Sequence, residues 1–184
     1  MRETLAEWKR QWDSPAGRRV RTGAYWLLLA VLAGVVIARY LPDYDLPDLG
    51  PAPPMEYAAL EGGTARLADH AGEVMVVNVW ATWCPPCVVE TPGFVDLAHE
   101  FEGDVQFWGI STDTDLDAVR EFAARYEIPY PLLVGANRAG PPPTGRVLPT
   151  TLVIDKAGRV RMRHEGLLLE PALRPILKAL VREG

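Results

Sequence analysis

From about residue 55 onward, the chain alternates between short apolar runs and longer stretches whose apolar residues recur at helical spacing. The runs EVMVVNVW (73–80) and VQFWGIS (105–111) are almost continuously apolar, which is typical of strands buried on both faces. Residues 115–126 repeat apolar side chains on one helical face, and a further helix is predicted from 86 to 101. Shorter strands are predicted at 131–134, 150–155 and 159–164.

The order of these elements predicts an α/β fold with a mixed sheet flanked by helices. Strands that alternate with helices need crossover connections, and hence a parallel part of the sheet. The turn Lys156-Ala157-Gly158 adds an antiparallel hairpin, and Gly62-Gly63 joins an N-terminal β-hairpin. A closing helix begins at Pro171 or restarts at Pro175. We therefore expect one domain over residues 55–184.

The first quarter of the chain has a different pattern. Residues 24–41 are apolar apart from Arg39, whose side chain can reach lipid headgroups, and they predict a transmembrane helix. The leader, residues 1–23, holds six basic and three acidic side chains, which predicts that it stays in the cytoplasm. A cleaved signal peptide is the alternative, although the long leader favours a retained anchor. Either way, the domain is expected outside the inner (cytoplasmic) membrane, facing the periplasm or cell exterior.

Composition adds a linker and excludes one class of partner. Residues 42–54 contain five prolines, which favour extended chain and predict a semi-rigid spacer between anchor and domain. The whole chain has a net charge of −5 although its leader is basic. An acidic body argues against nucleic acid as a partner, because phosphate binding requires clustered Lys and Arg.

Both cysteines, Cys84 and Cys87, lie between the strand at 73–80 and the helix that follows it. A structural zinc site needs four ligands, and neither a third cysteine nor a closely spaced His pair is present, so no metal site is predicted. Haem attachment needs a histidine where Val88 stands. A static disulfide would close almost no loop and add little stability, yet it remains an alternative. A redox couple fits better, since the start of a helix stabilises a thiolate.

The segments VVNVWATWCPPC and VLPTTLVID resemble the TlpA/ResA-like, membrane-anchored thiol–disulfide oxidoreductases of the thioredoxin superfamily. The resemblance covers residues 55–184 and implies a thioredoxin fold that reduces disulfides of other proteins. Such proteins often serve cytochrome c maturation or copper-centre assembly, so the implied partners are exported apoproteins, apocytochrome c or copper-site proteins. No cofactor motif is present, so a membrane thiol electron donor would have to regenerate the dithiol.

The same resemblance assigns roles to single residues. Cys84 would be the exposed nucleophile, and the more buried Cys87 would resolve the mixed disulfide. Glu90 would exchange a proton with Cys87, unless it is only a solvated glutamate in the first helical turn. Pro149 would adopt the cis form opposite the cysteines, and the backbone of Leu148 would pair with an extended stretch of substrate.

The residues beside the cysteines complete the predicted site. Trp83 would flank the nucleophile as an apolar contact, with a purely buried aromatic as the alternative. Asn78 stands where thioredoxins keep a buried aspartate. Pro85 and Pro86 lack N–H groups, so a thiolate at Cys84 would have fewer donors and the pair a reducing character. Pro86 is also expected to keep Pro85 out of helical geometry. The predicted substrate contacts are Trp83, Pro85, Pro86, Leu148 and Pro149.

Three further features leave alternatives open. Residues 135–147, with three consecutive prolines, depart from the family pattern and form either a surface connection or an insert that reshapes the target groove. His164 raises the possibility of a copper-binding chaperone, although the cysteines of such chaperones are spaced one residue wider. The same fold can also serve as a disulfide oxidant or isomerase. The segment STDTDLD (111–117) is interpreted as a helix N-cap rather than a calcium loop.

Overall fold

The computed structural model describes residues 22–33, 46–135 and 147–183, and the chain divides into two units, Met1–Asp43 and Tyr44–Gly184. In the first unit, residues 22–33 form a helix with exposed apolar side chains. None of the helices in these described ranges is long and apolar enough to cross a membrane. The remainder of the predicted transmembrane segment, residues 34–41, lies outside the described residues, as does the leader up to residue 21.

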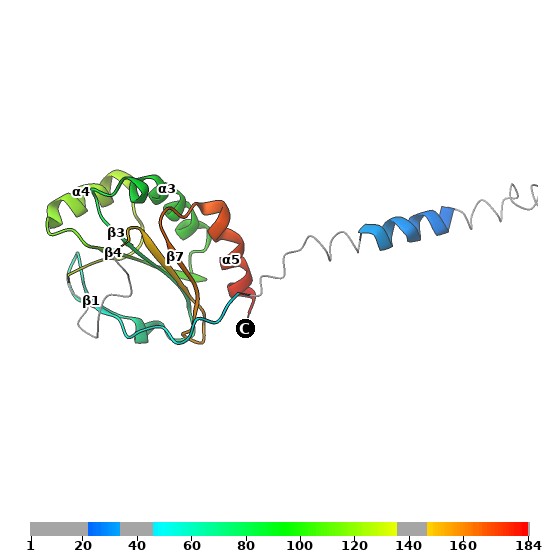
Figure 1. Cartoon of the computed structure of the whole chain (residues 1–184), viewed down its shortest axis with the longest axis horizontal. Helices are drawn as coiled ribbons and strands as arrows, with labels where there is room; N and C mark the ends of the chain where they lie inside the picture. The colour runs from blue at the N-terminus through cyan, green and yellow to red at the C-terminus, as the bar shows by residue number, and fades with distance from the viewer. Residues whose placement is uncertain (1–21, 34–45, 136–146, 184) are drawn as a thin grey trace, which may run out of the picture. The chain divides into compact units, whose positions relative to one another are not determined.

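The second unit is built on a seven-stranded mixed sheet with the order β2-β1-β5-β4-β3-β6-β7 (Figure 1). Strands β3, β4 and β5 are parallel, β6 and β7 continue the sheet in antiparallel fashion, and the hairpin of β1 and β2 pairs with the other side of β5. The predicted mixed sheet and both hairpins are confirmed. The strands are β1 (Glu56–Ala59), β2 (Thr64–Arg66), β3 (Val74–Trp80), β4 (Val105–Ser111), β5 (Leu132–Val134), β6 (Thr150–Ile154) and β7 (Val160–Glu165).

Three helices, α3 (Pro85–Glu100), α4 (Leu116–Tyr126) and α5 (Glu170–Arg182), cover one face of this sheet (Figure 1). The crossovers from β3 to β4 and from β4 to β5 run in the same direction, so right-handed connections place α3 and α4 on the same side. The short 3-10 helix η1 (Leu67–His70) lies on the other side, where Leu67 packs with Met75 and Val77. Asp115 caps α4 by accepting hydrogen bonds from the amides of Asp117 and Ala118, which confirms the predicted N-cap.

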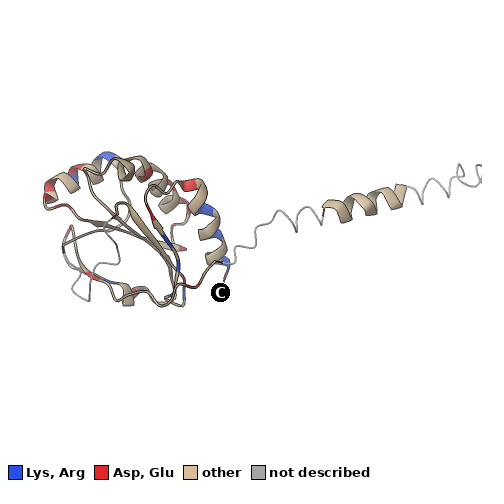
Figure 2. Ribbon diagram, in the orientation of Figure 1, with Lys and Arg blue, Asp and Glu red and all other residues tan. Residues whose placement is uncertain are grey.

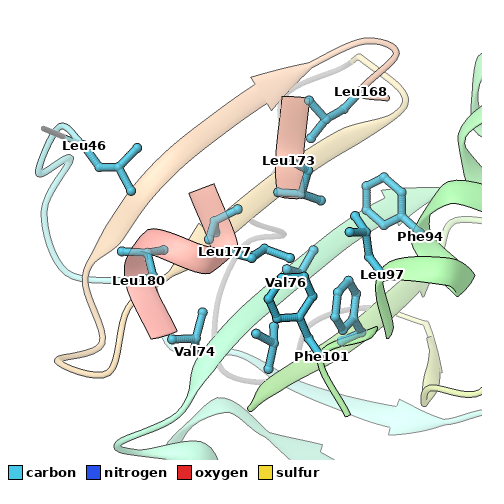
Figure 3. Close-up of a cluster of buried hydrophobic side chains, with 13 residues drawn as sticks. Leu46, Val74, Val76, Phe94, Leu97, Phe101, Leu168, Leu173, Leu177 and Leu180 are labelled. Atoms are coloured by element: carbon cyan, nitrogen blue, oxygen red, sulfur yellow. The ribbon is translucent and has the colours of Figure 1, made fainter. Parts of the chain in front are cut away.

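Strand β3 lies inside the sheet, between β4 and β6, and all seven of its residues are buried. Val74 and Val76 point toward α3 and α5 and pack with their apolar residues (Figure 3). Met75 and Val77 point to the opposite face. Because side chains alternate along a strand, Asn78 shares the helix-facing side with Val76. This alternation brings a polar group under α3 at the end of the strand that leads to the cysteines.

Basic and acidic residues are interspersed along the helices α3, α4 and α5 (Figure 2). At the C-terminal end of α3, Glu100 pairs with Arg174 (2.7 Å) and Lys178 (3.1 Å) of α5. These surface ion pairs lie beside the apolar contact between the same two helices.

The folded domain begins before Met55, where the sequence analysis placed its start. Leu46 packs into the core beneath α5, and its carbonyl accepts a hydrogen bond from Arg161 (3.0 Å). The amide of Leu49 donates to the carbonyl of Val160 (2.9 Å), whose own amide donates to Gly50 (2.9 Å). The predicted spacer is therefore wrong from Leu46 onward. Proline-rich chain cannot form a helix, but it can lie extended along the unpaired edge that β7 offers.

Candidate active site

The two cysteines lie at the junction of β3 and α3. The strand ends at Trp80, and the amide of Cys84 donates to the carbonyl of Ala81 (3.2 Å) to close the turn into the helix. Cys84 is the N-cap of α3 and Cys87 lies in its first turn. They are joined by a disulfide, with their Cα atoms 5.3 Å apart.

Both prolines between the cysteines belong to the helix. Helix α3 begins at Pro85, one residue earlier than predicted. The expectation that Pro86 keeps Pro85 out of helical geometry is wrong. That restriction is a preference, and here the turn is held by the disulfide and by the amide of Val88, which donates to the carbonyl of Cys84 (3.1 Å). The first N–H groups of a helix lack intrahelical acceptors in any case, so prolines cost little there.

Neither cysteine is open to solvent in this disulfide-bonded form. Cys84 is 3% exposed and Cys87 is 1% exposed, so the expectation of an exposed Cys84 is wrong. The disulfide-bonded pair packs in an apolar cluster with Trp80 and Ala81. Trp83 is instead 68% exposed, so the alternative of a buried aromatic is wrong for this residue.

Glu90 lies one helical turn beyond Cys87 and is buried, with 3% of its surface exposed. The alternative of a solvated glutamate is therefore wrong. Its Oε1 accepts a hydrogen bond from the side-chain amide of Asn78 (2.8 Å), and its Oε2 accepts one from the backbone amide of Leu168 (3.0 Å). Burial raises the pKa of Glu90 to about 7, against the opposing effect of these two hydrogen bonds. A carboxyl that titrates near neutral pH can take up or release a proton beside Cys87.

Asn78 is a site residue whose contacts the sequence analysis missed. Its side-chain nitrogen donates to Glu90 and also to the hydroxyl of Thr151 (3.1 Å), its partner in the register between β3 and β6. In the sequence, Asn78 can be noticed as a single amide in an otherwise apolar strand, at a position whose side chain faces the helices. Its neighbours come from α3 and from a strand far along the chain, so local pattern could not identify them.

Pro149 follows a cis peptide bond after Leu148, as the family resemblance implied. Leu148 packs against the apolar cluster that contains the two cysteines. The carbonyl of Pro149 accepts a hydrogen bond from the amide of Gly166 (2.8 Å). Two residues further on, Leu168 donates to Glu90, so the segment from Gly166 to Leu168 connects the cis-proline to the buried carboxylate.

A second polar network holds the loop that leads to Cys84. Asp113, just beyond the end of β4, accepts hydrogen bonds from the amide of Thr82 (2.9 Å), the hydroxyl of Thr82 (2.6 Å) and the hydroxyl of Ser111 (2.8 Å). The adjacent C-terminal ends of the parallel strands β3 and β4 place these groups together. From the sequence, this segment is interpreted as a helix N-cap rather than a calcium loop, and its contact with the cysteine loop is missed.

His164 lies on β7, and its Nε2 is 3.1 Å from the carbonyl oxygen of Leu167. Within the described ranges, no group of three or more His, Cys, Asp or Glu side chains is arranged to hold a metal ion. Most of the proline-rich loop, residues 136–146, lies outside the described residues. Val147, which follows it, is exposed.

The site combines a disulfide at the start of a helix, a cis-proline whose preceding residue packs against the cysteine cluster, and a buried acid one turn along the helix. This combination is typical of thioredoxin-like thiol–disulfide oxidoreductases. The model of the AhpC/TSA family matches residues 49–163, and the chain belongs to this family.

Among curated relatives, the thiol-disulfide oxidoreductase ResA of Geobacillus thermodenitrificans (strain NG80-2) is 29% identical over 170 residues, 88% of this chain and 94% of that protein. The thioredoxin-like protein YneN of Bacillus subtilis (strain 168) is 27% identical over 150 residues, 77% of this chain and 88% of that protein. A solved thiol:disulfide interchange protein of the thioredoxin family from Chlorobium tepidum TLS matches with a TM-score of 0.62 and 26% identity, over 74% of this chain and 99% of that one. These findings confirm the resemblance and identify the chain as a thiol–disulfide oxidoreductase.

Proposed function

We propose that this protein reduces disulfides of exported proteins through the dithiol of Cys84 and Cys87. The thiolate of Cys84 attacks one sulfur of the target disulfide, forms a mixed disulfide and releases the first target thiolate. Cys87, after losing its proton to Glu90, attacks the sulfur of Cys84 and releases the second target thiolate. The target gains two electrons, and the bond between Cys84 and Cys87 forms.

One observation carries this proposal: the buried carboxyl of Glu90, with a pKa of about 7, one turn from Cys87. A resolving thiol reacts as the thiolate, so a thiol in an apolar cluster needs a nearby base that takes its proton. A static disulfide has no use for such a group. Burying a carboxyl without a cation is costly, so its presence beside the cysteines supports a proton-coupled reaction.

The substrate contacts proposed for this reaction lie around the disulfide. The exposed ring of Trp83 and the exposed Pro85 offer apolar contact to an incoming chain, with Pro86 beside them. The backbone of Leu148, before the cis-proline Pro149, would pair with an extended segment of the target.

The direction of electron flow proposed here is reduction. Pro85 and Pro86 occupy the first helical turn, where other helices offer free amides to a thiolate at the N-cap. Fewer donors stabilise the thiolate less, which makes the reduced form a stronger reductant. Equilibration with glutathione measures the potential, and a value as oxidising as those of disulfide-introducing enzymes would assign the protein to the oxidant class instead.

The proposed location is the outer side of the inner membrane, with residues 24–41 as a single anchor. The apolar run and the basic leader before it support this arrangement. A membrane thiol donor would regenerate the dithiol, and apocytochrome c or a copper-site apoprotein would be the target. Protease treatment of intact cells or spheroplasts tests the orientation, since digestion of the domain from the outside is expected.

The burial of both cysteines sets a condition on this function. The donor's thiolate must reach the sulfur of Cys84, so the disulfide must be reducible while the domain stays folded. We expect a dithiol reagent to reduce it with the domain's circular dichroism unchanged. A disulfide that reacts only after unfolding would be structural, and the proposed function would fail.

The decisive experiment traps the target. The Cys87→Ser variant keeps the proposed nucleophile but cannot resolve the mixed disulfide, so it should accumulate a covalent complex with its substrate that thiol reagents release. The matched Cys84→Ser variant, which retains Cys87, should trap none. Equal trapping by both variants would contradict the assigned roles, and mass spectrometry of the complex identifies the target.

A further inference from the structure

Asn78 connects the buried carboxylate to the strand that follows the cis-proline. It is 7% exposed, Glu90 is 3% exposed and Thr151 is fully buried. One side-chain amide group donates to Oε1 of Glu90 at 2.8 Å and to the hydroxyl of Thr151 at 3.1 Å. The –NH₂ group of an asparagine has two hydrogens, so these two bonds use its whole donor capacity. The hydrogen bond to Thr151 therefore fixes the orientation of the amide group that donates to Glu90.

The two oxygens of Glu90 are each held by one donor. Asn78 on β3 serves Oε1, and the backbone amide of Leu168 serves Oε2. Both donors are neutral groups. Hydrogen bonds to a carboxylate favour its charged form, whereas burial favours the neutral form. The pH at which Glu90 changes charge therefore depends on two opposing effects: burial raises it, and the hydrogen bond from Asn78 lowers it.

The other titratable groups near Glu90 do not replace this donor. The pKa of Tyr130 is raised by burial and further by the charge of Glu90, so its phenol is not charged near neutral pH. Cys87, on the same face of α3, is bonded to Cys84. Glu170 lies against Gly93, one turn along α3, and forms an ion pair with Arg174.

A purely structural explanation does not account for an amide at this position. The neighbouring helix-facing positions of β3 hold Val74, Val76 and Trp80, and an apolar residue in place of Asn78 would avoid burying a polar group. The contacts of the amide instead lead to Glu90 and to an anchor, Thr151. These contacts indicate that the role of Asn78 is to donate a hydrogen bond to the carboxylate of Glu90.

We propose that Asn78, anchored by Thr151, is a positioning residue that aims a donor at Glu90 and so sets the pH at which this carboxyl exchanges the proton of Cys87. This inference rests on the proposed function and deepens it. During resolution the proton moves from the sulfur of Cys87 to a carboxylate oxygen of Glu90, and later to the released target thiolate or to water. A weaker donor at Oε1 makes the carboxyl keep its proton to higher pH, so the reaction needs more alkaline conditions.

The test follows the titration of Glu90 itself. The full chain, labelled with ¹³C at the side-chain carboxyl of glutamate, is titrated by NMR, and the Glu90→Gln variant identifies the signal. Asn78→Leu retains a side chain branched at the same carbon but has no donor. We expect it to raise the Glu90 midpoint by about one pH unit and to move the pH profile of thiol–disulfide exchange by the same amount.

Thr151 provides a matched pair of variants that leaves Asn78 in place. Thr151→Val removes the hydroxyl at nearly constant volume, and we expect an upward shift smaller than that of Asn78→Leu. Thr151→Ser keeps the hydroxyl and should titrate like the wild type. If Asn78→Leu does not fold, this pair decides alone. Identical midpoints for wild type, Thr151→Val and any folded Asn78→Leu would overturn the inference.

The outcomes separate the inference from the proposed function. If the wild type exchanges disulfides but its Glu90 midpoint ignores both substitutions, the positioning role fails and the function stands. If the midpoint moves as expected while the wild type fails to reduce a protein disulfide, the donor role of Asn78 toward Glu90 is supported and the function fails.

Discussion

Helix α3 carries two glutamates, ten positions apart, whose environments are opposite. Glu90, near the cysteines, is buried and bonded to neutral donors, and its pKa is raised to about 7. Glu100, at the other end, is exposed and hydrogen-bonded to Arg174 and Lys178 of α5, which lower its pKa. At one end of the helix, Glu90 can hold a proton near neutral pH. At the other end, Glu100 forms ion pairs that connect α3 to α5. Burial without a cation, rather than the residue type, therefore distinguishes the reactive end of the helix.

The largest effect should come from the sulfur at the N-terminal end. Cys84→Ser removes the proposed nucleophile, and we expect reduction of insulin to fall by at least about a thousandfold, because the remaining thiol, Cys87, is buried in the first turn of α3. Stability should change little, since the ring closed by this disulfide is small. Thermal unfolding of the variant and of reduced wild type provides the control. If Cys84→Ser retained activity, the N-terminal end of α3 would not be the reactive end, and the contrast with its C-terminal end would fail.

Leu97→Ala, in the C-terminal half of α3, should lower stability and leave the activity of the folded protein unchanged. Leu97 is fully buried among residues of α5 and β3 (Figure 3). Its truncation should lower the free energy of unfolding by about 3 kcal/mol while the exchange rate of the folded molecules is unchanged. Urea denaturation measures the first quantity, and assays well below the unfolding midpoint measure the second. His99→Ala, on the exposed side of the same turn, is the matched control and should affect neither.

Glu90→Gln tests the raised pKa through its effect on stability. A folded-state pKa of about 7, above the ordinary value of 4.5, means that the folded form holds this proton more tightly than the unfolded form. The protonated carboxyl therefore favours folding at low pH, and this contribution is lost as pH rises from about 4.5 to 7. Relative to Glu90→Gln, the wild type should lose about 3 kcal/mol of stability across that window. A difference that stays constant from pH 4 to pH 8 would contradict the raised pKa.

Several parts of the molecule could be predicted from local sequence. The apolar run of β3, the helical periodicity of α4 and the turn at Gly62-Gly63 each depend on residues close in the chain, and the structure confirms them. The cis bond before Pro149 is confirmed as well, although only the family resemblance implied it. Cis bonds are a minority among X–Pro bonds, and nothing in the local pattern distinguishes this proline.

Other features depend on contacts between distant segments, and the sequence could not predict them. Asn78 meets Glu90 because β3 and α3 pack together, and it meets Thr151 because β6 pairs with β3. The burial of Cys84 depends on side chains that other elements bring around the disulfide. The prolines of residues 42–54 exclude a helix and so predict a spacer, yet composition cannot say whether an extended chain pairs with the edge of a strand.

Glu100→Gln should change stability least among these substitutions. The carboxylate of Glu100 lies at the surface and interacts with Arg174 and Lys178, and water and salt weaken such pairs. Its pKa is lowered on folding, so its small contribution is present above the ordinary glutamate pKa and is lost as pH falls through the folded value. The difference between wild type and Glu100→Gln should therefore shrink toward low pH and vanish in high salt. For Glu90 the dependence on pH has the opposite sign, and burial limits its screening by salt.

Thermal unfolding of both variants at low and high salt, from pH 3 to pH 8, measures the two slopes. Slopes of the same sign would show that the two ends of α3 do not differ in the way their environments require.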